Sequence, residues 1–133
     1  MPHELVNPPE LGPTVGFSHA TVAAAGRTVY LGGQTAQDST GKIVGDDIVS
    51  QFDRALSNVV IALKAAGGEP GDIVSMVIYT TDMSAYRGAL KDLGRAYQSH
   101  LGRHYPAMAL LGVSELFDPQ ALVEIIATAV IAP

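Results

Sequence analysis

The clearest structural signal in this sequence is the stretch DIVSMVIYTTD at residues 72–82. Large apolar and β-branched side chains dominate it, and an aspartate bounds it at each end, which predicts a strand over residues 73–81 that is buried on both faces. Segments with helical periodicity lie on both sides of this strand. A buried strand between two helices is typical of a domain in which helices cover a sheet.

Two helices are predicted around the strand. The apolar stripe of the first consists of Ile48, Phe52, Ala55, Leu56, Val59 and Leu63. Asp46 or Asp47 can cap this helix, and Gly67, Gly68 and Pro70 end it. The apolar stripe of the second consists of Tyr86, Leu90, Leu93, Tyr97 and Leu101, with Ser84 as its candidate N-cap and Gly102 as its stop.

The remaining elements are strands. They are predicted over residues 17–25, 28–34, 107–113 and 121–131, and the first two form a hairpin through Ala25, Gly26 and Arg27. Residues 1–13 contain four prolines and are expected to be an irregular lead-in. The order β-β-α-β-α-β-β over residues 1–133 predicts a single α/β domain of the α+β two-layer type, with a mixed sheet covered on one face by two helices. The uncovered face of such a sheet favours oligomerisation.

Composition narrows the function classes. The chain has no cysteine, which excludes disulfides, thiolate metal sites and a cysteine nucleophile. Its net charge is -5 and its basic residues are scattered, so nucleic acid is not expected as the main partner. The longest apolar run, residues 125–133, is shorter than a bilayer span, and no signal peptide is visible. We therefore expect a cytoplasmic protein with no membrane partner.

A series of short motifs resembles one known family. The motifs are GFSHA at 16–20, VYLGGQ at 29–34, TGKIVG at 40–45, LSNV at 56–59, AAGG at 65–68, DIVSMVIY at 72–79, PA at 106–107 and ALVEIIA at 121–127. In this order, over nearly the whole chain, they are similar to the Rid family (YjgF-like, reactive intermediate imine deaminases). The resemblance implies a chorismate-mutase-like fold and a homotrimer with its sheets facing inwards and small-molecule clefts between subunits. It also implies hydrolysis of reactive imines and enamines without a cofactor.

The family site is only partly preserved. The resemblance places the family's catalytic glutamate at Glu124 and its backbone-contributing glycine at Gly33. It places the catalytic arginine at Met108, directly after Pro-Ala, and the N-terminal tyrosine at Phe17. The residue two positions after the arginine, usually cysteine or threonine, is Leu110. Arginine binds a carboxylate with two parallel hydrogen bonds, and methionine has no donor, so 2-imino acid deamination is expected to fall by orders of magnitude.

The candidate site therefore has two parts, and each has a structural alternative. Glu124 is the candidate general acid or base, or else it is merely paired at a subunit contact. Phe17, Gly32, Gly33, Met108 and Leu110 are the candidate substrate-binding residues. The two glycines would otherwise mark a bulge or tight packing, and Phe17 would otherwise be a core residue.

Three histidines and one arginine are further candidates for the functional site. His100 and His104 have a spacing that suits a metal on a helix, but Gly102 lies between them, so we interpret them as an exposed pair and expect no metal site. His19 is a candidate for the cleft mouth. Arg103 is a candidate replacement for the missing arginine.

Three functions remain open. One is a divergent, cofactor-free hydrolase in which Glu124 activates water on a substrate without the usual carboxylate. Another is a non-catalytic trimer that binds or senses a small metabolite. The third, ribonuclease or translation inhibitor, is least favoured because the net charge of -5 gives no phosphate-binding surface.

Overall fold

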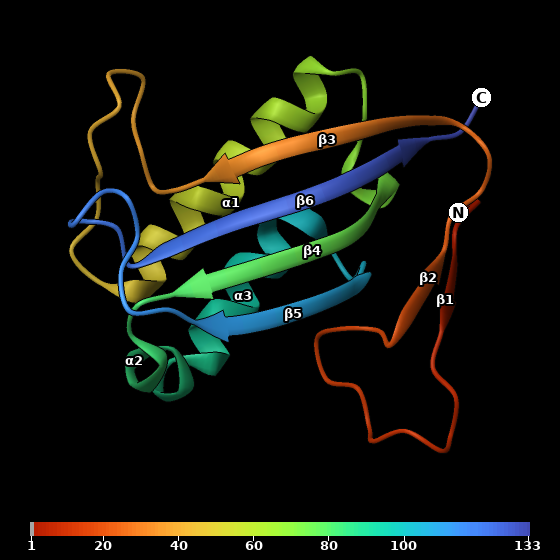
Figure 1. The fold of residues 1–133 in the computed structure, drawn as a ribbon, viewed down its shortest axis with the longest axis horizontal. Helices are drawn as coiled ribbons and strands as arrows, with labels where there is room; N and C mark the ends of the chain where they lie inside the picture. Colours follow the sequence, from red (N-terminus) through yellow and green to blue (C-terminus); the bar gives the residue numbers. More distant parts are fainter. Residues whose placement is uncertain (1) are drawn as a thin grey trace.

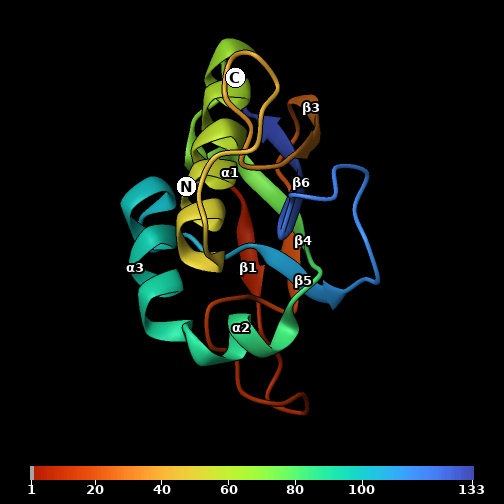
Figure 2. The ribbon, with the colours of Figure 1, turned by 90° about the vertical axis from the view of Figure 1, so that its left-hand side faces the viewer.

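The computed structural model describes residues 2–133 and shows one mixed sheet with its helices on a single face (Figure 1). The strand order is β3–β6–β4–β5, in which β4 and β5 are parallel and the other pairs are antiparallel. The strands span Arg27–Gln34 (β3), Ile73–Thr80 (β4), Ala107–Gly112 (β5) and Val123–Ile131 (β6). Figure 2 shows the helices on one side of the sheet and no element of similar size on the other. The predicted α/β fold class, with a mixed sheet covered on one face, is confirmed.

Helix α1 (Ile48–Ala65) begins and ends where the sequence predicts. Asp47 is the N-cap, and its carboxylate accepts a hydrogen bond of 2.8 Å from the backbone N–H of Ser50. The backbone N–H of Asp47 in turn donates a hydrogen bond of 3.3 Å to the hydroxyl of Ser50, which completes a capping box. Hydrogen bonding from Ser50 to the carboxylate, chiefly from its backbone N–H, lowers the pKa of Asp47. The helix ends at Gly67, whose φ of 92° is the left-handed conformation that favours glycine.

The second predicted helix is two helices. They are α2 (Met83–Gly88) and α3 (Leu90–Leu101), separated at Ala89, and a short 3-10 helix, η1 (Pro70–Asp72), precedes β4. The predicted N-cap Ser84 is wrong, because Asp82 caps α2 by accepting a hydrogen bond of 3.0 Å from the N–H of Ala85. A carboxylate is a stronger hydrogen-bond acceptor than a serine hydroxyl. With Asp82 as the N-cap, Ser84 lies inside the first turn of α2. Gly102 ends α3, as predicted.

The N-terminal region differs from the prediction. Strand β1 (Glu4–Val6) lies within the segment expected to be irregular and pairs antiparallel with β2 (Ala20–Val22). The predicted hairpin is wrong, because β2 does not pair with β3. The physical reason is His3, whose Nε2 lies 2.8 Å from the carbonyl oxygen of Val130 and whose Nδ1 accepts from the N–H of Ala24. This buried imidazole links the backbone after β2 to β6, while β2 itself pairs with β1.

The hydrophobic core lies between the sheet and the helices. Along β6 and, from Met76 onwards, along β4, alternate side chains point into it: Met76, Ile78, Val123, Ile125 and Ala127. Ile73 also belongs to the core, but the pairing of β4 with β6 shifts between Ile73 and Ser75. From α1, the core receives Phe52, Ala55, Leu56, Val59 and Leu63. The prediction that β4 is buried on both faces is wrong for the single chain, because Ser75 is exposed and Val77 and Tyr79 are only half-buried.

Among residues 2–133, no helix is long and apolar enough to cross a membrane.

Gln51 connects α1 to two loops at the end of the sheet. Its side chain is 3% exposed, and its amide nitrogen donates to the carbonyl oxygens of Gly45 and Gln120, both at 3.1 Å. Its amide oxygen accepts from the N–H of Leu122 at 2.8 Å. Three backbone groups thus depend on one buried side chain for their hydrogen bonds.

Replacing Gln51 with methionine, which keeps the size of the side chain, is expected to lower the free energy of unfolding by about 3 kcal/mol, because buried backbone groups lose their partners. Urea denaturation followed by circular dichroism measures this loss. The matched control is Gln120→Met, since that side chain is exposed. A loss below about 0.5 kcal/mol in Gln51→Met, similar to the control, would contradict the assignment.

Candidate functional site

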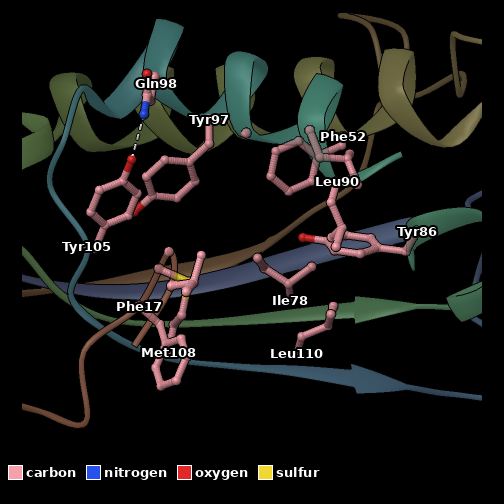
Figure 3. Close-up of a pocket in the computed structure, with 14 residues that line it drawn as sticks. Phe17, Phe52, Ile78, Tyr86, Leu90, Tyr97, Gln98, Tyr105, Met108 and Leu110 are labelled. Atoms are coloured by element: carbon pink, nitrogen blue, oxygen red, sulfur yellow. Dashed lines mark hydrogen bonds between the residues drawn. The ribbon is translucent and has the colours of Figure 1, made fainter. Parts of the chain in front are cut away.

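An apolar cavity of about 690 Å³ lies between α3 and the helix-covered face of β4 and β5 (Figure 3). Its floor is formed by core residues, among them Phe52, Ile78 and Leu93. Residues from α3, β5 and the loop that joins β1 to β2 surround the opening. The full lining is Val15, Gly16, Phe17, Phe52, Ile78, Tyr86, Leu90, Leu93, Gly94, Tyr97, Gln98, Tyr105, Met108 and Leu110.

Three of the predicted substrate-binding residues meet in this cavity. Met108 and Leu110 pair in register with Met76 and Ile78 of the parallel neighbour β4. Because Met76 and Ile78 are 1% and 3% exposed and point towards the helices, the paired side chains of β5 point to the same side. Phe17 reaches the cavity from the loop between β1 and β2.

The loop that carries Phe17 is held by its own polar contacts. The hydroxyl of Ser18 donates to the carbonyl oxygen of Tyr105 at 2.6 Å, and its N–H donates to that of Pro106 at 3.1 Å. His19 contacts the ring of Phe17 edge-on, with centroids 5.4 Å apart, and its Nε2 lies 2.8 Å from the carbonyl oxygen of Gly12. His19 does not line the cavity. It orders the loop that presents Phe17.

The polar groups of the cavity are neutral. The hydroxyl of Tyr97 donates to the carbonyl oxygen of His104 at 2.6 Å. Its ring stacks on that of Tyr105, with centroids 5.2 Å apart and an interplanar angle of 12°. Burial raises the pKa of Tyr97, and it raises the pKa of Tyr86 to about 12. Both phenols therefore keep their protons at neutral pH, and no residue of the lining is acidic, basic or a histidine.

Sequence reasoning missed Tyr86, Tyr97 and Gln98 as site residues. Tyr86 and Tyr97 belong to the apolar stripe that predicted the second helix, and the sequence does not distinguish a tyrosine that fills a core from one that borders a cavity. The sequence signal that could have identified them is the hydroxyl group, because the hydroxyl of a buried tyrosine needs a polar neighbour.

Glu124 lies on the opposite face of the sheet. In β6 it is flanked by the buried Val123 and Ile125, so its side chain points away from the helices, and it pairs in register with Tyr79. Met108 and Glu124 therefore do not share a cavity within one chain. Among residues 2–133, no hydrogen bond or ion pair engages the carboxylate of Glu124.

The two candidate glycines lie in β3, and Gly33 lies beside Glu124. The pairing of β3 with β6 shifts between Leu31 and Gln34, so Gly32 and Gly33 form a bulge, which is one of the structural alternatives raised by the sequence. A Cβ on Gly33 would lie only 3.0 Å from Cδ of Glu124, so the carboxyl group occupies the space that a side chain would need. A Cβ on Gly32 would meet nothing within 4 Å.

The remaining candidates lie outside the cavity. Arg103 is exposed in the turn after α3 and is not part of the lining. His100 and His104 are half-buried, which corrects the prediction of an exposed pair. They have separate partners: Nε2 of His100 lies 2.8 Å from Oδ1 of Asp53, and Nε2 of His104 lies 2.7 Å from the carbonyl oxygen of Ile73. Within residues 2–133, no three acidic or histidine side chains converge as they would around a metal ion.

Comparison of this chain with known proteins identifies a family. A family model described as endoribonuclease L-PSP matches residues 8–131. A RutC family protein of Pyrococcus horikoshii is 30% identical over 92% of this chain and 90% of its own length. The 2-iminobutanoate/2-iminopropanoate deaminase of Capra hircus is 31% identical over 95% of this chain and 85% of its own.

Solved structures agree with the sequence relatives. The crystal structure of YyfB from Yersinia pestis, described as a Rid family protein of unknown function, superimposes with a TM-score of 0.88 and 32% identity, covering 98% of this chain and 100% of the other. Since the family model spans nearly the whole chain and both kinds of relative agree, this protein belongs to the endoribonuclease L-PSP family, the family of the Rid (YjgF-like) proteins.

Proposed function

We propose that this protein binds an uncharged, mainly apolar small molecule in the cavity of Phe17, Met108 and Leu110, and that it does not efficiently deaminate 2-imino acids. The observation that carries this proposal is the lining, which contains no side chain that is charged at neutral pH. An imino acid carries a carboxylate, and moving a carboxylate into apolar surroundings without a cation is strongly unfavourable. The thioether of Met108 is polarizable and suits an apolar or aromatic group.

We further propose that the chain assembles as a homotrimer with the uncovered sheet face inwards. Tyr30 is 82% exposed and Ile126 is 36% exposed on this face in the single chain, and Tyr79 and Val77 lie near them. Contiguous apolar side chains of this kind favour burial against another subunit. Clefts between such subunits would enclose Glu124.

A second candidate function is hydrolysis of a small imine or enamine without a cofactor. The observation that favours it is the carboxylate of Glu124, which has no hydrogen-bond partner within residues 2–133 and lies against Gly33. A carboxylate in this state is available to take a proton from water, once a neighbouring subunit encloses it. Its substrate would lack a carboxylate where Met108 replaces the family's arginine. The ribonuclease alternative has less support, because the net charge is -5 and no cation lines the cavity.

The deamination prediction is tested by ammonia release from 2-iminopropanoate and 2-iminobutanoate generated by an amino-acid oxidase. We expect this protein to accelerate hydrolysis at least about 100-fold less than the goat deaminase assayed beside it, the loss typical of removing a charged anchor. Glu124→Gln is the matched variant. Acceleration comparable to the goat enzyme that disappears in Glu124→Gln would contradict the proposal and favour the hydrolase.

The assembly prediction is tested by analytical ultracentrifugation. We expect a mass about three times that of the 13.9 kDa chain, and a shift to the monomer in Ile126→Asp, because a charge would be buried in the interface. Ile61→Asp is the matched control, since Ile61 is 61% exposed on α1, away from the sheet. A monomeric natural protein, or equal dissociation of both variants, would contradict the inward-facing trimer.

A further inference from the structure

One face of α3 is arranged to leave space and to present one polar group. Its residues at 90, 93, 94, 97 and 98 all line the cavity, which is the spacing of a single helix face. Gly94 lies at the middle of this face, and a Cβ built on it would meet nothing within 4 Å. Glycine weakens a helix interior, and at this exposed position it leaves open space beside the cavity.

One turn further along α3, Gln98 meets Tyr105 at the opening of the cavity. The amide nitrogen of Gln98 donates to the hydroxyl of Tyr105 at 2.8 Å (Figure 3). The tyrosine oxygen is then occupied as an acceptor, and its O–H remains available as a donor. The amide oxygen of Gln98 remains available as an acceptor, because no other hydrogen bond within residues 2–133 engages either group.

The position of Tyr105 is set by its neighbours. Its ring stacks on Tyr97, whose own hydroxyl is occupied by the carbonyl oxygen of His104. Its backbone carbonyl accepts from the hydroxyl of Ser18, in the loop that carries Phe17. The donor of Tyr105 is therefore held next to the acceptor of Gln98, which suits a ligand with an acceptor and a donor side by side.

We propose that the cavity recognises a neutral carboxamide or lactam attached to a compact apolar or aromatic body. The ligand carbonyl would accept from the O–H of Tyr105, and the ligand N–H would donate to the amide oxygen of Gln98. The apolar body would lie over Gly94, between Phe17 and Met108. This assignment rests on the proposed function, since it names the chemistry of the ligand in the same cavity.

The test uses three probes of similar size: benzamide, ethylbenzene and benzoate. Amide NMR titrations of the natural protein are expected to show benzamide and ethylbenzene binding at the cavity residues and benzoate failing to bind. Tyr105→Phe keeps the ring stacking and removes the donor. We expect it to weaken benzamide about tenfold, the loss of one hydrogen bond, and to change ethylbenzene less than twofold. Gln98→Met is expected to act in the same direction.

Gly94→Leu is the variant that separates binding from folding. It fills the space over α3, so both neutral probes are expected to stop binding, while the melting temperature stays the same or rises because a glycine has left a helix. Gly88→Leu, at the exposed end of α2, is the matched control and should bind both probes normally.

Each result decides between the two proposals. If ethylbenzene binds and Tyr105→Phe leaves benzamide unchanged, or weakens both probes equally, the carboxamide assignment is overturned and the apolar binding function stands. If neither neutral probe binds the natural protein, or if benzoate binds as well as benzamide, the proposed function itself is wrong, and the carboxamide assignment falls with it.

Discussion

The alternation of side chains along the antiparallel pair β4 and β6 is the constraint on which the rest of the structure depends. From Met76 in β4 and from Val123 in β6, every second residue points to the helices and forms the core, and the residues between them point to the uncovered face. A shift of pairing by one residue would exchange the two sets and expose the core. The same alternation extends to β5 through its parallel register with β4, so it also decides on which side Met108 and Leu110 lie.

This constraint divides the candidate functional residues between two environments. The helix side holds an apolar cavity with neutral hydrogen-bonding groups at its mouth. The other side holds Glu124, whose carboxylate lies beside Gly33 in the bulge of β3. Chemistry that needs a charged base and chemistry that needs an apolar pocket are therefore separated by the thickness of the sheet.

The sequence predicts those parts of the fold in which local pattern and tertiary packing agree. The capping aspartate and apolar stripe define α1, and the β-branched run defines β4, because these signals lie within a few residues of one another. The pairing of β2 with β1 could not be predicted, since it comes with a buried contact between His3 and Val130, two residues that are distant in sequence. The register between β4 and β5 is equally non-local. For this reason the sequence could identify Met108, Leu110 and Glu124 as candidates but could not show that they lie on opposite faces.

Phe17 reaches the cavity on a loop that contributes no strand to the main sheet and is held by Ser18, by His19 and by hydrogen bonds to Asn7 and Gly12. The residues of this loop that line the cavity, Val15, Gly16 and Phe17, are thus not members of the hydrophobic core. Substitutions in this loop can change the shape of the cavity mouth at little thermodynamic cost to the core. Such modularity allows ligand preference to drift during evolution while the scaffold stays constant, and it gives protein engineers a short segment in which to redesign selectivity.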